Sequence, residues 1–366
     1  MPGIPFASSA VLAVLADEAW RPLIASARTE ARTTEVTTAF AHAVNLELGG
    51  AQFTLLAAGG RPAPGALITD RSDFSGVRAG DRVVIRAEGL EIGGRGGLVV
   101  DLRGIGYFDS RVESLAGRDP FGEGEPPYSI DPPGPRVRLD PRSVAGLLAE
   151  TARPGSFVPA ENGPPFERAV GARLAIARSA FGLALAAEIR GAAPSAARSA
   201  ARPPIASPEL RRAVSELVGL GIGLTPSGDD YLVGTLVVLS VHPDAETARG
   251  AVAVAVRELL GSADGRDRTT AVSRHFLLAA CERAFHSDLA AAARAVLLGD
   301  PAARAAFASA AAIGSTSGTD ALFGLVDAYA ALETPGDGRP CAHDRPAESV
   351  ILRAGSPALD SEGGTP

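Results

Sequence analysis

A glycine-rich stretch followed by hydroxyl and carboxylate side chains is the part of the sequence best suited to chemistry. It runs from Gly219 to Asp230, reads Gly-Leu-Gly-Ile-Gly-Leu-Thr-Pro-Ser-Gly-Asp-Asp, and leads into a hydrophobic run. Ser227 stands where a helix N-cap would stand, with Asp230 three residues later as in a capping box. A glycine-rich turn at a helix start exposes backbone N–H groups and the positive end of the dipole, which favours phosphate or carboxylate. The adjacent carboxylates of Asp229 and Asp230 suit a divalent cation instead, and the whole motif also fits a simple helix start.

A second copy of this pattern begins at Gly314. It reads Gly-Ser-Thr-Ser-Gly-Thr-Asp-Ala-Leu-Phe-Gly, and both copies keep Thr, Ser, Gly, Asp, Leu and Gly in the same order. Capping requires only the Ser and the Asp, so the other shared residues need another explanation. Gly234 and Gly324 fall inside predicted helices, where glycine costs about 1 kcal/mol relative to alanine. Close approach of a ligand, or close packing of the two helices against each other, would each account for them.

A polar helix start lies between the two copies. Thr269 and Ser273 are four residues apart and therefore share one face of the helix. Such hydroxyls often bond back to their own helix. Arginines also surround them, and arginine binds oxyanions through two hydrogen bonds. The arginines in question are Arg266, Arg268 and Arg274.

We therefore expect three helix starts to converge on one pocket for a small anion. The residues predicted to bind it are Gly223, Thr225, Ser227, Gly228, Thr269, Thr270, Ser273, Thr316, Ser317 and Gly318. The candidate catalytic groups are Asp229, Asp230 and Asp320, which would orient the anion-binding groups or hold Mg²⁺. Magnesium is the one cofactor that these residues suggest, and no specific metal-ligand set is predicted.

The motifs resemble those of the AllH-like family, which is named for a subunit of oxamate carbamoyltransferase in allantoin breakdown. The resemblance rests on Gly-x-Gly-Leu-Thr-Pro-Ser-x-Asp-Asp, Thr-Thr-x-x-Ser and Gly-x-Thr-Ser-Gly-x-Asp-x-Leu-x-Gly in that order. An earlier segment, Ala43-Val44-Asn45-Leu46, with Phe53-Thr54-Leu55-Leu56 and Pro64-Gly65 after it, extends the resemblance from about residue 40 to about residue 330. Family members commonly carry a His where this chain has Ser315, so one acid–base or phosphate contact is missing here.

The resemblance implies transfer of a carbamoyl group from carbamoyl phosphate to oxamate, giving oxalurate and phosphate, in purine degradation. It also implies a hetero-oligomer with AllF-like and AllG-like subunits. Transfer of this kind needs mainly positioning and neutralisation of developing charge. One alternative is a non-catalytic subunit that binds an anion or supports catalytic partners, and another is a related enzyme with a different small carboxylate acceptor. The absence of lysine and of a convincing general base favours the non-catalytic alternative.

Composition narrows the classes of function. The chain has 366 residues and a net charge of −7, which argues against a nucleic-acid or anionic-membrane partner. Every basic side chain is arginine, which excludes a lysine-based phosphate loop and a Schiff-base lysine. Cys281 and Cys341 form no disulfide framework or zinc cluster, and the five histidines form no ligand set. The longest apolar run, Leu232 to Val241, is too short to span a bilayer, and no basic segment marks a signal peptide, so we predict a cytoplasmic protein.

The pattern of elements predicts an α+β chain. Residues 1–135 form a predicted β-rich domain, a small antiparallel sheet or barrel with a helical start at 10–27 and strands within 34–48, 52–57, 66–69, 81–86 and 97–102. A Pro- and Gly-rich boundary at 116–137 separates it from a mostly helical domain at 136–332, which carries both motifs. Besides the helix that follows the first motif, helices are predicted at 140–151, 165–189, 209–220, 247–260, 287–298, 302–312 and 317–332. A further helix is predicted from Thr269 through Phe285, and His275 and His286 are assigned to it. Residues 191–208 are predicted to form a flexible loop and residues 333–366 a disordered tail.

Overall fold

The computed structural model describes residues 11–93, 97–115, 138–155, 157–158, 164–191 and 204–334. The predicted boundary at 116–137, most of the loop at 191–208 and the tail beyond Thr334 lie outside these residues, as does the Arg266 side chain. The predicted domain limits therefore stay predictions.

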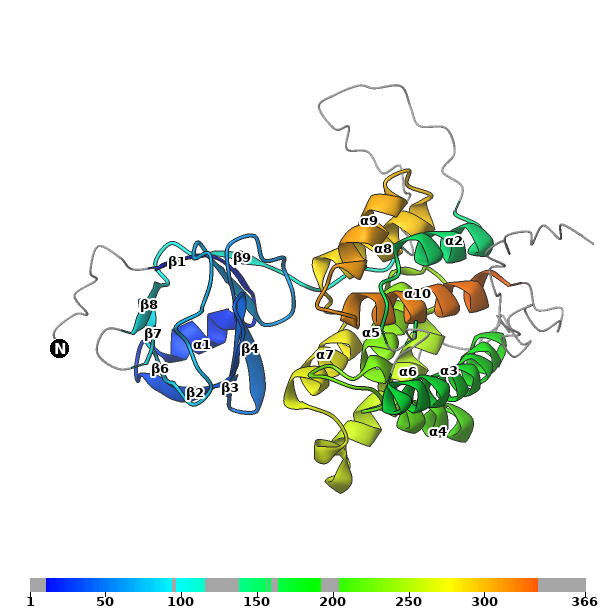
Figure 1. The fold of residues 1–366 in the computed structure, drawn as a ribbon, viewed down its shortest axis with the longest axis horizontal. Coiled ribbons are helices and arrows are strands. Elements are labelled where there is room, and N and C mark those ends of the chain that lie inside the picture. The colour runs from blue at the N-terminus through cyan, green and yellow to red at the C-terminus, as the bar shows by residue number, and fades with distance from the viewer. Residues whose placement is uncertain are drawn as a thin grey trace, which may run out of the picture. The chain divides into compact units, whose positions relative to one another are not determined.

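Eight strands close into a barrel (Figure 1). Their order around the ring is β5-β4-β3-β2-β6-β7-β8-β1, and pairing of β1 with β5 closes it. The strands are β1 Val11–Asp17, β2 Arg32–Ala39, β3 Ala43–Leu48, β4 Ala51–Leu56, β5 Ala66–Thr69, β6 Arg82–Ile85, β7 Gly89–Ile92 and β8 Leu98–Asp101. A ninth strand, β9 Gly106–Phe108, adds to β1 in parallel. The short helix α1, Trp20–Ser26, contributes Trp20, Leu23 and Ile24 to the core of the barrel.

The predicted α+β class is confirmed, but two details of the β-rich part were wrong. The expected helix at 10–27 is β1 followed by α1, because a run of Ala, Val and Leu fits either structure until its pairing partners are known. The barrel is also not purely antiparallel, since β1 pairs in parallel with β8 and β9, and β4 pairs in parallel with β5. The pairs of β1 with β8 and β9 join segments that are distant along the chain, which local patterns do not reveal.

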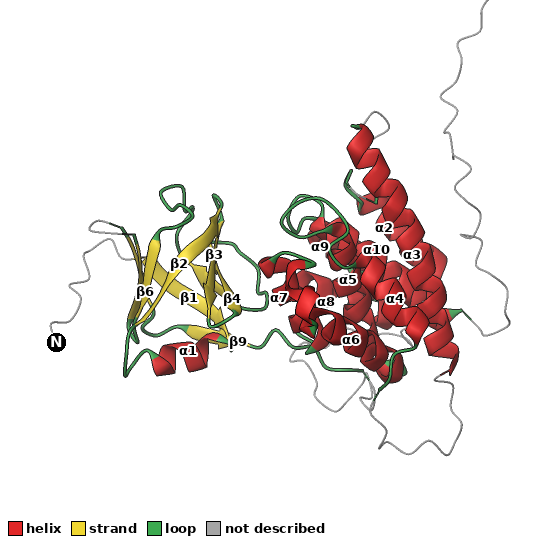
Figure 2. Cartoon of the chain, turned by 90° about the horizontal axis from the view of Figure 1, so that it is seen from below, coloured by secondary structure: helices red, strands yellow, loops and turns green. Residues whose placement is uncertain are grey.

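Helices make up the rest of the described chain (Figure 2). They are α2 Pro141–Thr151, α3 Pro165–Gly191, α4 Pro208–Leu217, α5 Ser227–Val241, α6 Glu246–Gly261, α7 Ala271–Cys281, α8 Ser287–Leu298, α9 Ala303–Ala311 and α10 Ser317–Glu333, with a 3₁₀ turn at Ala263–Asp267. These ranges confirm the predicted helices within a few residues, except that α7 ends at Cys281 instead of continuing through Phe285. Arg283 adopts a positive φ of 66° there, and His286 begins α8 as its N-cap instead of lying on α7.

The helices α5 and α10 lie side by side, and both are almost entirely buried. Each has a glycine at the crossing point. A Cβ on Gly234 would lie 1.7 Å from the carbonyl oxygen of Ala321, and a Cβ on Gly324 would lie 1.9 Å from that of Tyr231. Tyr231 and Ala321 occupy the same position in the two motif copies, so the contact is reciprocal. Of the two explanations for these glycines, close helix packing is the one that the structure shows.

Helix α3 is the one helix among the described residues that is long and apolar enough to cross a membrane by length and composition. It is buried only along part of its surface: Leu174, Ala177 and Phe181 are completely buried, whereas Phe166, Ile176 and Leu183 are exposed. One such helix is weak evidence for a membrane span.

Candidate functional site

The structure brings the three predicted helix starts together. The hydroxyl of Thr225, in the first motif, lies 2.7 Å from the hydroxyl of Ser317, in the second. The start of α7 joins the first motif through Thr270 Oγ1, which donates to the carbonyl oxygen of Leu224 at 2.6 Å. Residues almost a hundred positions apart along the chain thus share one small polar region.

The predicted capping boxes were wrong in both copies. The N-cap of α5 is Pro226 and that of α10 is Thr316, and neither helix start has a side-chain capping hydrogen bond. Ser227 and Ser317 are instead the first residues of their helices. A Ser-x-x-Asp spacing fits a serine at either position, so the pattern alone does not distinguish them.

The serines face the opposite motif. The hydroxyl of Ser317 lies near Asp230 of α5 as well as Thr225, and the hydroxyl of Ser227 lies near Asp320 of α10. Each aspartate also lies near the threonine of its own motif, Thr225 for Asp230 and Thr316 for Asp320. The two copies therefore form an approximately twofold arrangement in which each carboxyl group is bordered by hydroxyls from both motifs.

Asp229 has a different environment. Its Oδ1 accepts the N–H of Gly219 at 2.8 Å, and its Oδ2 accepts hydrogen bonds from the hydroxyls of Ser273, at 2.6 Å, and Thr269. Burial raises the pKa of this carboxyl above its usual value, while the three donors act in the opposite direction. Its hydrogen bonds tie the glycine-rich loop to α7, which positions the site. Its predicted catalytic role stays a prediction.

The other two carboxyl groups are poorly satisfied. Burial raises the pKa of Asp320 to about 6, against the effect of the Ser227 hydroxyl, the Phe157 backbone N–H and the Thr316 hydroxyl. Burial, followed by the nearby charge of Asp320, raises the pKa of Asp230 well above its usual value. Both oxygens of Asp320, one oxygen of Asp230 and the Ser227 hydroxyl nevertheless lack a hydrogen bond of normal geometry.

The glycines predicted to bind the anion have a structural role, because they allow backbone conformations and contacts that a side chain would prevent. A Cβ on Gly228 would lie 2.1 Å from the carbonyl oxygen of Leu217, and one on Gly318 would lie 1.9 Å from that of Ala310. Each therefore lets a motif helix begin directly against the end of the preceding helix, α4 or α9. Gly223 adopts a φ of 106° on the exposed part of the loop, a conformation that side chains disfavour.

Exposure separates the groups that a solute can reach from those behind them. Thr225, Asp230, Thr316 and Ser317 are partly exposed, and Thr269 and Thr270 are partly exposed at the start of α7. Ser227, Asp229, Ser273 and Asp320 are buried. Ser315 is exposed.

The nearby arginines point at backbone carbonyl groups. Arg268 Nη1 donates to the Ser215 carbonyl at 3.2 Å, and Arg274 Nη1 donates to the Leu260 carbonyl at 2.6 Å. Each guanidinium keeps further N–H donors beyond this bond, and the predicted contact of these arginines with an oxyanion stays a prediction.

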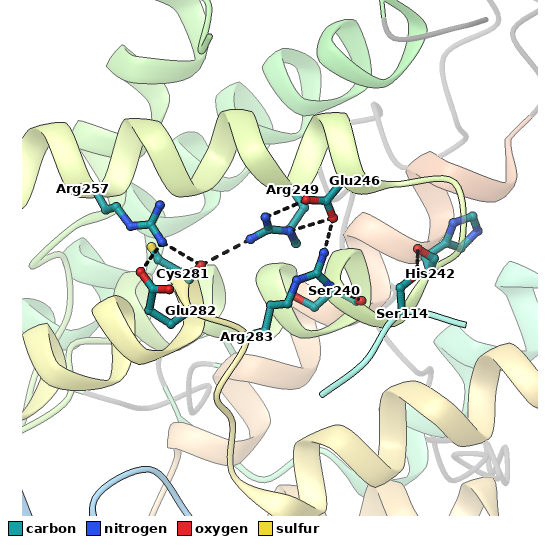
Figure 3. A network of polar contacts seen from close by, with 9 residues as sticks. All are labelled: Ser114, Ser240, His242, Glu246, Arg249, Arg257, Cys281, Glu282 and Arg283. Atoms are coloured by element: carbon teal, nitrogen blue, oxygen red, sulfur yellow. Dashed lines mark hydrogen bonds and ion pairs between the residues drawn. The ribbon is translucent and has the colours of Figure 1, made fainter. Parts of the chain in front are cut away.

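Three further arginines have a similar structural role (Figure 3). Arg249 and Arg257 donate to the carbonyl oxygen of Cys281, where α7 ends, and Arg283 donates to that of Ser240 near the end of α5. Cations at these positions are favoured because the last carbonyl groups of a helix lack partners within the helix.

The sequence analysis missed the segment that follows α2. The Phe157 N–H lies near the Asp320 carboxyl group, the Arg153 N–H donates to Thr319 Oγ1 at 3.1 Å, and Gly155 lies against the Thr316 side chain. These contacts are made mostly by backbone atoms. No residue type or spacing in the sequence predicts such contacts.

Metal ligands are limited within the described ranges. No group of three or more His, Cys, Asp or Glu side chains there is placed to hold a metal ion. The predicted Mg²⁺ would therefore need hydroxyl, water or substrate oxygens beside the aspartates.

Comparison with known families agrees with the motifs. Residues 217–329 match the model of the family described as oxamate carbamoyltransferase subunit AllH. Residues 12–107 match the model of the AllH family N-terminal domain. Together the matches cover more than half of the chain and include both motifs and the segment around Asn45. No solved structure matches the chain.

Proposed function

The chain belongs to the AllH family, and on that premise we propose that it works as a carbamoyltransferase-type subunit holding a small anionic substrate where α5 and α10 begin. The substrate class is carbamoyl phosphate, oxamate or a similar small carboxylate. The partners would be AllF-like and AllG-like subunits, in the cytoplasm.

The observation that carries this proposal is the contact between Thr225 and Ser317. It places the positive ends of two buried helices, of 15 and 17 residues, beside the same partly exposed hydroxyls. Hydroxyl groups can rotate to donate to a bound oxygen, and converging helix N-termini favour negative charge. Thr316 and Thr270 extend the same set of donors.

The transfer reaction requires mainly that the protein positions the two substrates. The acceptor nitrogen forms a bond to the carbamoyl carbon, the bond from that carbon to the phosphate oxygen breaks, and the nitrogen releases a proton. Negative charge grows on the departing phosphate, which helix N-termini and hydroxyl donors would stabilise. Asp229 is engaged by three donors and Asp320 is completely buried, which leaves the partly exposed Asp230, the departing phosphate or a group of a partner subunit to accept the proton.

One observation favours the second candidate, a non-catalytic anion-binding subunit. Arg268 and Arg274 are both engaged by carbonyl oxygens, and the chain has no lysine. A site that lacks a directed cation can bind an anion and still need a partner for the transfer. Phosphate release from carbamoyl phosphate and oxamate tests the second candidate. Release by the purified chain alone would exclude a non-catalytic role, whereas release only after adding the partners is expected of either candidate.

The binding site itself is tested with a double variant. Thr225→Val with Ser317→Ala removes both hydroxyls that meet, and we expect at least a tenfold loss of affinity for phosphate or oxamate by calorimetry. Ser309→Ala, an exposed serine on α9, is the matched control and should bind like the parent. Equal binding by a folded double variant would exclude the site proposed here.

A further inference from the structure

Four side-chain oxygens without a hydrogen bond gather where α5 and α10 begin. They are Ser227 Oγ, Asp230 Oδ2 and both carboxyl oxygens of Asp320. Ser227 and Asp320 are completely buried. A buried polar atom without a partner costs about 1–3 kcal/mol, and more when it is charged. So dense a group of such atoms indicates that something else binds there.

The approximate twofold arrangement surrounds these atoms with oxygen. The hydroxyls of Thr225 and Ser317 lie beside Asp230, and those of Ser227 and Thr316 lie beside Asp320. No cationic side chain is among the groups that shift the pKa of either carboxyl. Within the described ranges, two neighbouring acids therefore lie in a buried region whose nearby donors are all neutral: four hydroxyls and the Phe157 N–H.

Ser227 is the observation independent of the acids. It is a neutral hydroxyl at the first position of a helix, its oxygen has no hydrogen bond of normal geometry, and the polar group it lies near is the carboxyl of Asp320. A hydroxyl that only served packing would be replaced by alanine or bonded to a backbone carbonyl. An unpartnered hydroxyl directed at a carboxylate fits a metal ligand, because the oxygen lone pair can then bind a shared cation.

We propose that a divalent cation of the Mg²⁺ class binds between Asp230 and Asp320, with the Ser227 hydroxyl as a further ligand. Such hard cations prefer oxygen ligands, and Mg²⁺ typically uses only one or two carboxylates together with waters and substrate phosphates. A third acid is therefore unnecessary. The partly exposed face of Asp230, beside Thr225 and Ser317, leaves open positions toward the proposed substrate.

This inference rests on the proposed function and resolves a difficulty within it. Two carboxylates beside an anion site would repel the anion. A divalent cation held by them changes the sign of the local charge and gives the phosphate a direct partner. The substrate would then be recognised as an anion bound to the metal.

The test uses the purified full chain after treatment with EDTA. Free Mn²⁺ has a strong paramagnetic resonance signal that is lost on binding, so titration measures affinity without any activity. We expect one bound Mn²⁺ per chain, competed by Mg²⁺, and at least a tenfold weaker affinity in Asp320→Asn. Asp244→Asn, beyond the opposite end of α5, is the matched control and should bind like the parent.

A second variant protects the test against misfolding. Asp230→Asn carries the same expectation if Asp320→Asn fails to give the circular dichroism spectrum of the parent. Absence of Mn²⁺ binding by the parent overturns the proposal. So does unchanged affinity in either folded variant.

Phosphate and oxamate binding, measured with Mg²⁺ or with EDTA, separates this inference from the function on which it rests. Equal anion affinity in both conditions would overturn the cation site and leave the anion site standing. Binding of Mn²⁺ without any binding of phosphate or oxamate would support the cation site and overturn the proposed function.

Discussion

The contact between α5 and α10 predicts a large effect for Gly234→Ala. The added Cβ would lie 1.7 Å from the Ala321 carbonyl oxygen, whereas ordinary contact begins at 3.4 Å. The two backbones must therefore separate by about 1.7 Å at this point. Overpacking typically costs about 1–3 kcal/mol, and the upper end applies because a helix backbone cannot move aside as a side chain can. Alanine recovers about 1 kcal/mol of helix propensity, so we expect a net loss of about 2 kcal/mol.

Urea unfolding followed by far-ultraviolet circular dichroism measures this loss. The matched control is Gly182→Ala in α3, where an added Cβ meets no atom within 4 Å. That substitution should increase the free energy of unfolding by about 0.5–1 kcal/mol, because only the propensity of the helix changes.

The same variant links packing to the site. Separation of α5 from α10 displaces Thr225 from Ser317, so phosphate affinity should fall in the folded Gly234→Ala variant but not in Gly182→Ala. A Gly234→Ala protein as stable as the parent would refute the close approach of the helices. Reduced stability with unchanged phosphate affinity would refute the dependence of the site on that approach.

Two further predictions concern buried side chains. Tyr231→Phe removes the 2.8 Å hydrogen bond from the tyrosine hydroxyl to Asp327. We expect the free energy of unfolding, measured in urea, to fall by about 1.5 kcal/mol, because hydrogen bonds to charged groups contribute about 1.5–3 kcal/mol. An unchanged free energy of unfolding would contradict this prediction. Burial raises the pKa of the Cys281 thiol to about 12, so little of the reactive thiolate exists at pH 8. In a Cys341→Ser protein, which keeps Cys281 alone, we expect a thiol reagent to modify Cys281 only as fast as the chain unfolds. Rapid modification of the native protein would contradict this.

The helical part was the more predictable half of the fold. Apolar residues at helical spacing, bounded by glycine and proline, placed nearly every helix within a few residues of its observed range. The barrel was harder. Its strands β7 and β9 were not predicted, although β5, β6 and β8, which are similarly short, were. Closure depends on pairing β1 with β5, and nothing local specifies that pair.

The candidate site shows the same division. The repeated motif correctly indicated that distant helix starts meet, since two copies of one pattern suggest one shared environment. It did not indicate that each serine faces the aspartate of the other copy, because this depends on how α5 crosses α10. The contacts made by Arg153, Gly155 and Phe157 could not be predicted from the sequence, because they are made mostly by backbone atoms, which every residue type has.

The arrangement of the two copies explains why both are present in one chain. In each copy a helix ends and a glycine allows the next helix to start against it. The amide of that glycine, the second residue of the new helix, donates back to the preceding loop, from Gly228 to Leu220 at 2.8 Å and from Gly318 to Ile313 at 3.0 Å. Gly234 and Gly324 then allow α5 and α10 to pack closely against each other. Because the carboxyl groups of Asp230 and Asp320 each take one hydroxyl neighbour from each copy, neither copy alone provides the complete surroundings of either group. The site therefore forms only where α5 crosses α10, and any group that binds there also contacts both helices.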